Sequence, residues 1–295
     1  MTHEAPGRGI GERSFVWMQY VIPQHFISRL VYRATRSSWP WFKNRLIRWF
    51  IGRFPVDMSE AREPDASQFA TFNAFFTREL RAGLRRVDPA PDAVVSPADG
   101  FISRAGPIDA ETLIQAKGQA YQLADLLAGA AHWAAKFRGG SFVTVYLAPF
   151  NYHRVHVPTD ATLRETWYVP GRLFSVNTAT AAAVPRIFAR NERIIALFDT
   201  PAGPMAEVLV GALNVGSMST VWHGEVTPKA KRVITRLATP ETGATLERGA
   251  EMGRFNMGST VVLLFAPGTV TLDPGLDPGR VMRLGDRIGR WRART

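Results

Sequence analysis

The sequence predicts an α+β protein, with an antiparallel β-sandwich or partly closed barrel as its core and an amphipathic helical arm at its N-terminus. Beyond about residue 90, short apolar runs are broken by glycine, proline and aspartate, and helical patterns are few. This texture is typical of antiparallel sheets rather than of a Rossmann alternation. Before that point, aromatic and basic residues recur at helical spacing. The chain has 295 residues, of which 46% are hydrophobic, so it can bury a sizeable core.

The arm is expected to contain two amphipathic helices within residues 15–54. Apolar residues from Phe26 to Ala34 alternate with arginines, and the pattern resumes after Pro40 with Phe42 and Leu46. Half of the eight tryptophans lie in this region. Tryptophan and arginine on amphipathic helices suit a membrane interface. The same pattern also fits a helical pair that packs its apolar faces on the protein body, and the sequence leaves both open.

A third helix is expected from about Ser67 to Leu80, capped by Asp65 or Ser67, with its phenylalanines joining the arm to the body. A proline-rich boundary follows at residues 89–91, so we expect a helical membrane-associating region over residues 1–85 and a β-rich domain over 86–295. Two further helical patterns lie near Leu123–Leu127 and Ala179–Phe188. The predicted strands are Val94–Ser96, Phe101–Ala105, Ser141–Ala148, His153–Val157, Leu163–Val169, Ile194–Phe198, Val208–Val215, Val233–Leu237 and Thr260–Phe265.

Composition narrows the classes of function. There is no cysteine, which excludes disulfides, thiolate nucleophiles and cysteine-based metal sites. The net charge of +11 favours a polyanionic partner, either nucleic acid or an anionic membrane. We find no apolar run long enough for a transmembrane helix and no signal-peptide pattern. The protein is therefore expected in the cytosol or on the cytosolic face of the membrane.

The stretch most suggestive of chemistry is Gly258-Ser259, which leads into the apolar run Thr260–Phe265. Glycine lacks a Cβ, so its backbone can be approached closely. With a base nearby, the hydroxyl of Ser259 could add to the carbonyl of Gly258 and convert the amide into an ester. The simpler interpretation is a turn that enters a core strand.

Two other segments supply titratable groups. Asp99 lies in Ser96–Gly100, where Asp-Gly is also common turn chemistry, and His153 and His156 lie in the next notable motif. Histidines three apart point to opposite faces of a strand unless the chain bends. With no cysteine and no HExxH pattern, a metal site is not expected. Asp99, His156 and Ser259 could serve as orienting carboxylate, base and hydroxyl, although spacing alone does not bring them together.

At these residues the chain resembles the phosphatidylserine decarboxylase family, in its bacterial membrane-associated form. Six segments in the family's order carry the resemblance: TFNAFFTREL (Thr71–Leu80), SPADG (Ser96–Gly100), NYHRVHVP (Asn151–Pro158), LFSVN (Leu173–Asn177), VGALNVGSM (Val210–Met218) and EMGRFNMGST (Glu251–Thr260). Together they span most of the chain from Thr71 to Phe265. Met257 stands where a leucine is usual, which is a volume-conserving difference.

The resemblance implies a proenzyme that processes itself. Ser259 would attack the Gly258 carbonyl with His156 as base and Asp99 orienting it. The products would be a β chain of residues 1–258 and an α chain of residues 259–295, held as an α/β heterodimer or a dimer of such heterodimers. Ser259 would become a covalent pyruvoyl group, and neither pyridoxal phosphate nor a metal would be needed.

The resemblance also implies the decarboxylation of phosphatidylserine to phosphatidylethanolamine. The pyruvoyl group would bind the substrate amine and take up the electrons released with carbon dioxide. His153 would return a proton, while Phe174, Ser175 and Asn177 would belong to the substrate pocket. The arm would be a monotopic anchor on an anionic membrane, at the cytoplasmic side of the cell membrane. No nucleic acid partner is implied.

Two other functions remain open on the residues alone. A serine hydrolase could use Asp99, His156 and Ser259 on an external ester or amide, and its chain would stay intact. A non-enzymatic β module could bind lipid or nucleic acid through the +11 charge, with strongly salt-dependent binding.

Overall fold

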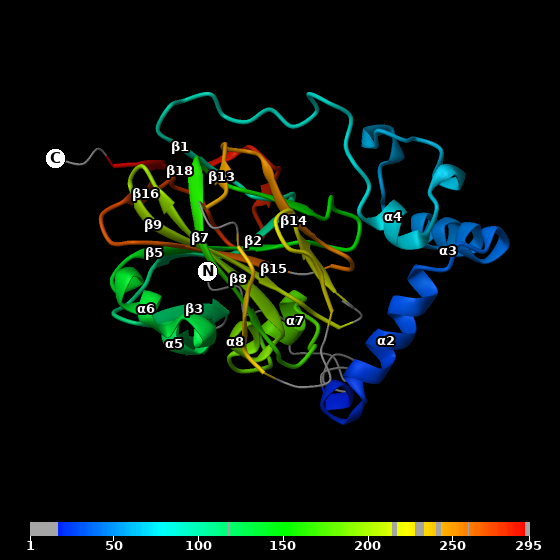
Figure 1. The fold of residues 1–295 in the computed structure, drawn as a ribbon, viewed down its shortest axis with the longest axis horizontal. Coiled ribbons are helices and arrows are strands. Elements are labelled where there is room, and N and C mark those ends of the chain that lie inside the picture. Colours follow the sequence, from blue (N-terminus) through cyan, green and yellow to red (C-terminus); the bar gives the residue numbers. More distant parts are fainter. Residues whose placement is uncertain are drawn as a thin grey trace, which may run out of the picture.

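The computed structural model describes residues 17–116, 119–213, 217–227, 233–239, 243–258 and 260–292. Helices α2 and α3 project from one side of a β-rich body, and α5 and α6 lie on the other side (Figure 1). The helices are α2 (Gln24–Thr35), α3 (Pro40–Arg53), α4 (Phe72–Phe76), α5 (Leu123–Leu126), α6 (Ala131–Phe137), α7 (Thr178–Ala181) and α8 (Ile187–Arg190), with 3₁₀ turns η1 (Met58–Glu60), η2 (Ala66–Gln68) and η3 (Ala128–Ala130).

The strands of the body pair antiparallel throughout the described residues. They are β1 (Ala93–Val95), β2 (Gly100–Pro107), β3 (Thr112–Ala116), β4 (Gln119–Gln122), β5 (Ser141–Tyr146), β6 (Arg154–His156), β7 (Ala161–Val169), β8 (Arg193–Thr200), β9 (Gly203–Val210), β10 (Met218–Thr220), β11 (Gly224–Val226), β12 (Thr235–Leu237), β13 (Thr245–Leu246), β14 (Glu251–Phe255), β15 (Thr260–Phe265), β16 (Val270–Leu272), β17 (Val281–Met282) and β18 (Arg287–Trp291).

A large sheet of nine strands has the order β12-β7-β8-β9-β15-β5-β2-β17, with β13 also paired to β7. Smaller sheets have the orders β11-β10-β14-β6, β1-β18-β16 and β3-β4. Within the described residues none of these sheets closes on itself. The predicted α+β class with an antiparallel core is confirmed, in the open form rather than the barrel.

The predicted strand that follows the Gly-Ser pair is confirmed as β15. It lies between β9 and β5, and its first residue Thr260 pairs with both Val210 and Tyr146. All six of its residues are buried, as expected for an apolar, β-branched run in the middle of a sheet. The bond between Gly258 and Ser259 therefore comes directly before the start of a buried, central strand in the chain.

The helix predicted over Ser67–Leu80 is wrong in its extent. The chain forms the turn η2 and the short α4 instead, with threonine side chains bonded to backbone groups of α4 at both of its ends. The Thr71 hydroxyl accepts from the Ala74 amide and caps α4, while the Thr77 hydroxyl donates to the Asn73 carbonyl at its end. The predicted role of the phenylalanines as the joint between arm and body is confirmed. Those of α4 pack with Ile47 and Phe50 of α3, and the ring of Phe76 contacts that of His153 in the body.

Other expected bounds shifted. The pattern over Ala179–Phe188 forms two short helices, α7 and α8, because Arg186 adopts a left-handed conformation between them. The strand predicted over Val208–Val215 is β9, which begins earlier and ends at Val210. The last residues of that predicted range lie outside the described part of the chain.

The two predicted arm helices are confirmed as α2 and α3. On α2 the buried residues are Gln24, Ser28 and Thr35, whereas Phe26 is 54% and Leu30 51% exposed. Phe26 and Leu30 of α2 thus face away from the body, while α3 buries Ile47 and Phe50 against α4. The packing alternative is confirmed for α3, while the exposed residues of α2 leave the membrane interface a prediction. No helix in the described ranges is long and apolar enough to cross a membrane.

Candidate functional site

An apolar cavity of about 410 Å³ lies between the arm and the body, and Met257 and Gly258 contribute to its wall. The arm supplies residues of α2, α3 and α4, including Ala34, Leu46 and Phe76. The chain thus brings a backbone position without a Cβ to a space lined mainly by aliphatic and aromatic side chains. Such concave apolar sites with few polar groups are typical of ligand pockets.

Two of the three predicted pocket residues, Ser175 and Asn177, line this cavity. The third, Phe174, is buried, with its ring centroid 4.9 Å from that of Tyr20. The amide of Ser175 is held by the side chain of Gln19 at 2.7 Å. Residues just before α2 therefore support the segment that forms one wall of the cavity.

Of the three predicted titratable residues, Asp99, His153 and His156, the one whose side chain approaches Gly258 is His153. A Cβ placed on Gly258 would stand 3.3 Å from Nε2 of His153. Nδ1 donates to the Asn151 carbonyl at 2.8 Å, so the neutral ring presents Nε2 as an acceptor. Nε2 is buried and has no hydrogen-bond partner in the described structure. Burial, with the charge of Arg78 as a smaller cause, lowers the pKa of His153 to about 3.

His156 has a different environment. Its Nδ1 donates to the Gly249 carbonyl at 2.8 Å, and its Nε2 accepts from the Tyr152 hydroxyl at 3.2 Å. Burial lowers the pKa of His156, so this ring is also neutral at neutral pH. Neither ring nitrogen bonds to Asp99 in the described structure, although the carboxylate is close enough to act on the imidazole through its charge.

Asp99 occupies the tight turn between β1 and β2, where the sequence predicts it. The turn needs the following glycine, because a Cβ on Gly100 would overlap the backbone oxygen of Tyr146. Oδ1 of Asp99 accepts from Arg85 Nε at 2.9 Å and from the Leu284 amide at 2.8 Å.

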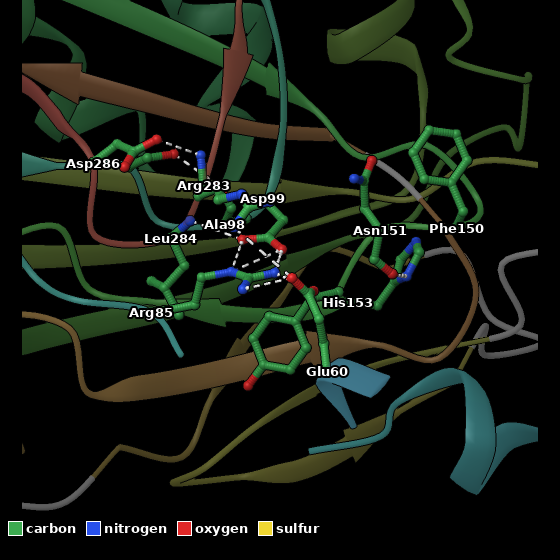
Figure 2. A network of polar contacts seen from close by, with 12 residues as sticks. Glu60, Arg85, Ala98, Asp99, Phe150, Asn151, His153, Arg283, Leu284 and Asp286 are labelled. Carbon is green, nitrogen blue, oxygen red and sulfur yellow. Dashed lines mark hydrogen bonds and ion pairs between the residues drawn. The ribbon is translucent and has the colours of Figure 1, made fainter. Parts of the chain in front are cut away.

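Figure 2 shows the Arg85 guanidinium between Asp99 and Glu60, with His153 apart from this group beside Asn151. Arg85 donates to Glu60 through both terminal nitrogens, at 3.2 and 2.6 Å. Both Arg85 and Asp99 are largely buried, so removing either side chain would leave the other as an uncompensated charge in the protein interior.

The structure therefore brings His153 to Gly258, and it places Asp99 near His156 without a hydrogen bond between them. Ser259 lies outside the described residues. Sequence reasoning missed Arg85 and Glu60, because a lone arginine in a basic chain carries no signal of its buried partner. It also missed that the arm forms part of the cavity wall, which no local pattern indicates.

Two family models match this chain. The family model described as phosphatidylserine decarboxylase matches residues 72–290, and a model described as PSD matches residues 14–55. The chain is 50% identical to a phosphatidylserine decarboxylase proenzyme of Marinobacter nauticus, with 95% of this chain and 98% of the relative covered. It is 52% identical to the proenzyme of the same name from Pseudomonas aeruginosa, covering 93% and 96%. A Methylococcus capsulatus proenzyme of that name is 51% identical, covering 94% and 96%. The chain belongs to the phosphatidylserine decarboxylase family.

Proposed function

We propose that this chain decarboxylates phosphatidylserine to phosphatidylethanolamine, using a pyruvoyl group made by cleavage of its own Gly258–Ser259 bond. The observation that carries the proposal is the apolar cavity whose wall includes Gly258. Beside that residue lies Nε2 of His153, which has no hydrogen-bond partner among the described residues. A buried acceptor without a donor is costly to leave unsatisfied. Its placement at this glycine is the arrangement that proton transfer near the bond requires.

The proposed self-cleavage converts the Gly258–Ser259 amide into an ester and then eliminates that ester. The Ser259 hydroxyl oxygen bonds to the Gly258 carbonyl carbon, the C–N bond breaks, and the proton passes through a base to the released amine. Elimination from the resulting ester leaves Gly258 as a free carboxylate and converts residue 259 into dehydroalanine. Water then replaces the nitrogen, which leaves as ammonia, and the pyruvoyl group remains.

Two histidines, His153 and His156, are candidates for the base in this step. Family resemblance predicts His156, oriented by Asp99. Proximity favours His153, whose Nε2 is the acceptor nearest to Gly258 in the geometry given above. Both rings are neutral at neutral pH, as a base requires, because burial lowers the pKa of each. The variants His153→Ala and His156→Ala, scored separately for cleavage and for decarboxylation, discriminate between them.

After cleavage, His153 would stand beside the new carboxylate of Gly258. A negative charge at this distance favours an imidazolium and raises the pKa of the histidine. The same ring that is neutral before cleavage would then hold the proton that decarboxylation returns to the substrate. When formed, the pyruvoyl group supplies an acceptor for the electrons released with carbon dioxide.

The arm accounts for access of the lipid. Its exposed apolar residues, among them Phe26 and Leu30, lie on the helix that also lines the cavity. We propose that the arm rests on the cytoplasmic surface of an anionic membrane and that acyl chains enter the cavity from it. Residues 1–85 would be the membrane-associating region and 86–295 the catalytic domain. The two cleavage products would remain together as an α/β heterodimer.

The test compares the unaltered chain with Ser259→Ala on phosphatidylserine vesicles. The unaltered chain should cleave and release carbon dioxide, while Ser259→Ala should stay intact and inactive. An intact, unaltered chain that reacts with a fluorophosphonate at Ser259 would instead support the serine hydrolase. Normal cleavage of Ser259→Ala would contradict the assigned bond.

A further inference from the structure

We propose that Asn256 is a positioning residue for the cleavage turn, which is the segment of residues 256–258 that leads to the bond to be cut. Glu225 and Arg36 connect Asn256 to helix α2, so that self-cleavage depends on the docked arm. This inference rests on the proposed self-cleavage at Gly258. It assigns to the arm a function in making the cofactor, in addition to its function at the membrane.

Asn256 lies two residues before Gly258, is only 3% exposed and is held at several points. Its backbone amide donates to the Ser217 carbonyl at 3.1 Å. Its side-chain Nδ2 lies 2.8 Å from the Ser217 hydroxyl, 3.1 Å from the Ser219 hydroxyl and 3.3 Å from Glu225 Oε1. A residue bonded through both backbone and side chain fixes the chain that leads into the turn.

Glu225 on β11 is the shared acceptor of this network. Its Oε1 accepts from the Asn256 amide, from the Ser217 hydroxyl and from the guanidinium of Arg36. Hydrogen bonds to an ionised carboxylate are roughly twice as strong as neutral ones. Glu225 therefore fixes Asn256 and Arg36 to the same point.

Arg36 brings the arm into this network. It is the C-terminal cap residue of α2, and its guanidinium also lies 3.1 Å from the Ser217 hydroxyl and 3.6 Å from the centre of the Tyr32 ring. A second helix joins from α4, where Asn73 Nδ2 lies 3.4 Å from Oδ1 of Asn256. Helices on the wall of the cavity are thus bonded to the residue that leads into the cleavage turn.

The physical consequence concerns the geometry of attack. An intramolecular reaction gains its rate from reacting atoms held at near-attack distance, and a displacement of about 1 Å can cost about a hundredfold. Loosening Asn256 or its carboxylate partner would widen the range of positions open to Gly258. The cavity wall and the bond to be cut would then no longer move as one unit.

The experiment follows the conversion of freshly refolded full-length chain into two chains on a denaturing gel. Arg36→Ala, Glu225→Gln and Asn256→Ala should each slow cleavage by about tenfold, the effect expected from losing a charge-assisted hydrogen bond. The matched control is Glu247→Gln, which removes an exposed carboxylate from the body and should leave the rate unchanged. Arg36→Lys, which keeps the charge, should recover part of the rate.

Melting temperatures of the same variants in the Ser259→Ala background separate positioning from general destabilisation. The proposal expects slow cleavage with a melting temperature close to that of the parent. Wild-type cleavage rates in both Arg36→Ala and Asn256→Ala would overturn it, as would slowing that only tracks loss of folded protein. If the unaltered chain does not cleave at all, the proposed function fails first and the network proposal falls with it.

Discussion

The burial of His153 predicts a measurable loss of stability in acid. In the folded chain its pKa is lowered to about 3, whereas in the unfolded chain it takes its ordinary value of about 6.5. Between these values the unfolded chain binds a proton that the folded chain does not, so stability is complete above the unfolded pKa and falls as the pH drops. At about pH 5, roughly 1.5 pH units below the unfolded pKa, the free energy of unfolding should fall by about 2 kcal/mol through this residue.

The assay uses Ser259→Ala, so that every molecule is an intact chain, and compares it with Ser259→Ala/His153→Gln. Guanidinium unfolding is followed by tryptophan fluorescence at about pH 8 and about pH 5. The chain that retains His153 should lose about 2 kcal/mol more on acidification. The control His223→Gln removes an exposed histidine and should leave the acid loss unchanged. Equal acid losses with and without His153 would refute the reasoning, because the ring would then protonate in the folded chain as readily as in the unfolded one.

Three further predictions concern the ion pair of Asp99, the helical arm and the apolar cavity. Asp99→Asn removes a buried charged partner of Arg85. It should lower the free energy of unfolding of the Ser259→Ala chain by about 3 kcal/mol in guanidinium denaturation. The control Asp92→Asn removes a partner from an exposed ion pair and should have no measurable effect in the same assay. Phe26→Ser and Leu30→Ser should each weaken flotation with anionic vesicles by about tenfold while leaving the melting temperature unchanged; unchanged flotation would separate the arm from the membrane. Ala34→Phe fills part of the cavity and should slow decarboxylation of long-chain phosphatidylserine more than that of a short-chain analogue, while equal slowing would argue against acyl chains in this space.

Much of the fold could be predicted because short apolar patterns in the sequence mark the strands of the sheet. The run Thr260–Phe265 is apolar and β-branched along its whole length, and it forms the buried β15 as expected. The phenylalanines of α4 likewise pack against α3. The extent of α4 could not be predicted, because its limits depend on whether Thr71 and Thr77 bond to the local backbone.

The orientation of α2 was harder to predict because its buried side is polar. Gln24 is buried because its side chain accepts from the distant Leu173 amide at 2.9 Å, and no pattern within the helix indicates that partner. Arg85 is a similar case, since its partners Glu60 and Asp99 lie on separate segments of the chain. Long-range polar pairs of this kind override the usual expectation that apolar residues face the body.

The candidate site could also be predicted only in part. Sequence motifs single out Asp99, His153 and His156, and the structure places all three in buried positions. These motifs do not reveal that His153, rather than His156, approaches Gly258. Its position depends on the bend of residues 149–153 and on the packing of Phe76, whose ring centroid lies 4.0 Å from that of the His153 imidazole. The assignment of a base and a proton donor to these histidines therefore stays a prediction.

Intact mass spectrometry of the purified protein under denaturing conditions tests the central claim most directly. The account predicts two chains, residues 1–258 and residues 259–295, with the second carrying a pyruvoyl group in place of its N-terminal serine. A single unmodified chain of 295 residues that persists after prolonged incubation, yet releases carbon dioxide from phosphatidylserine, would contradict it.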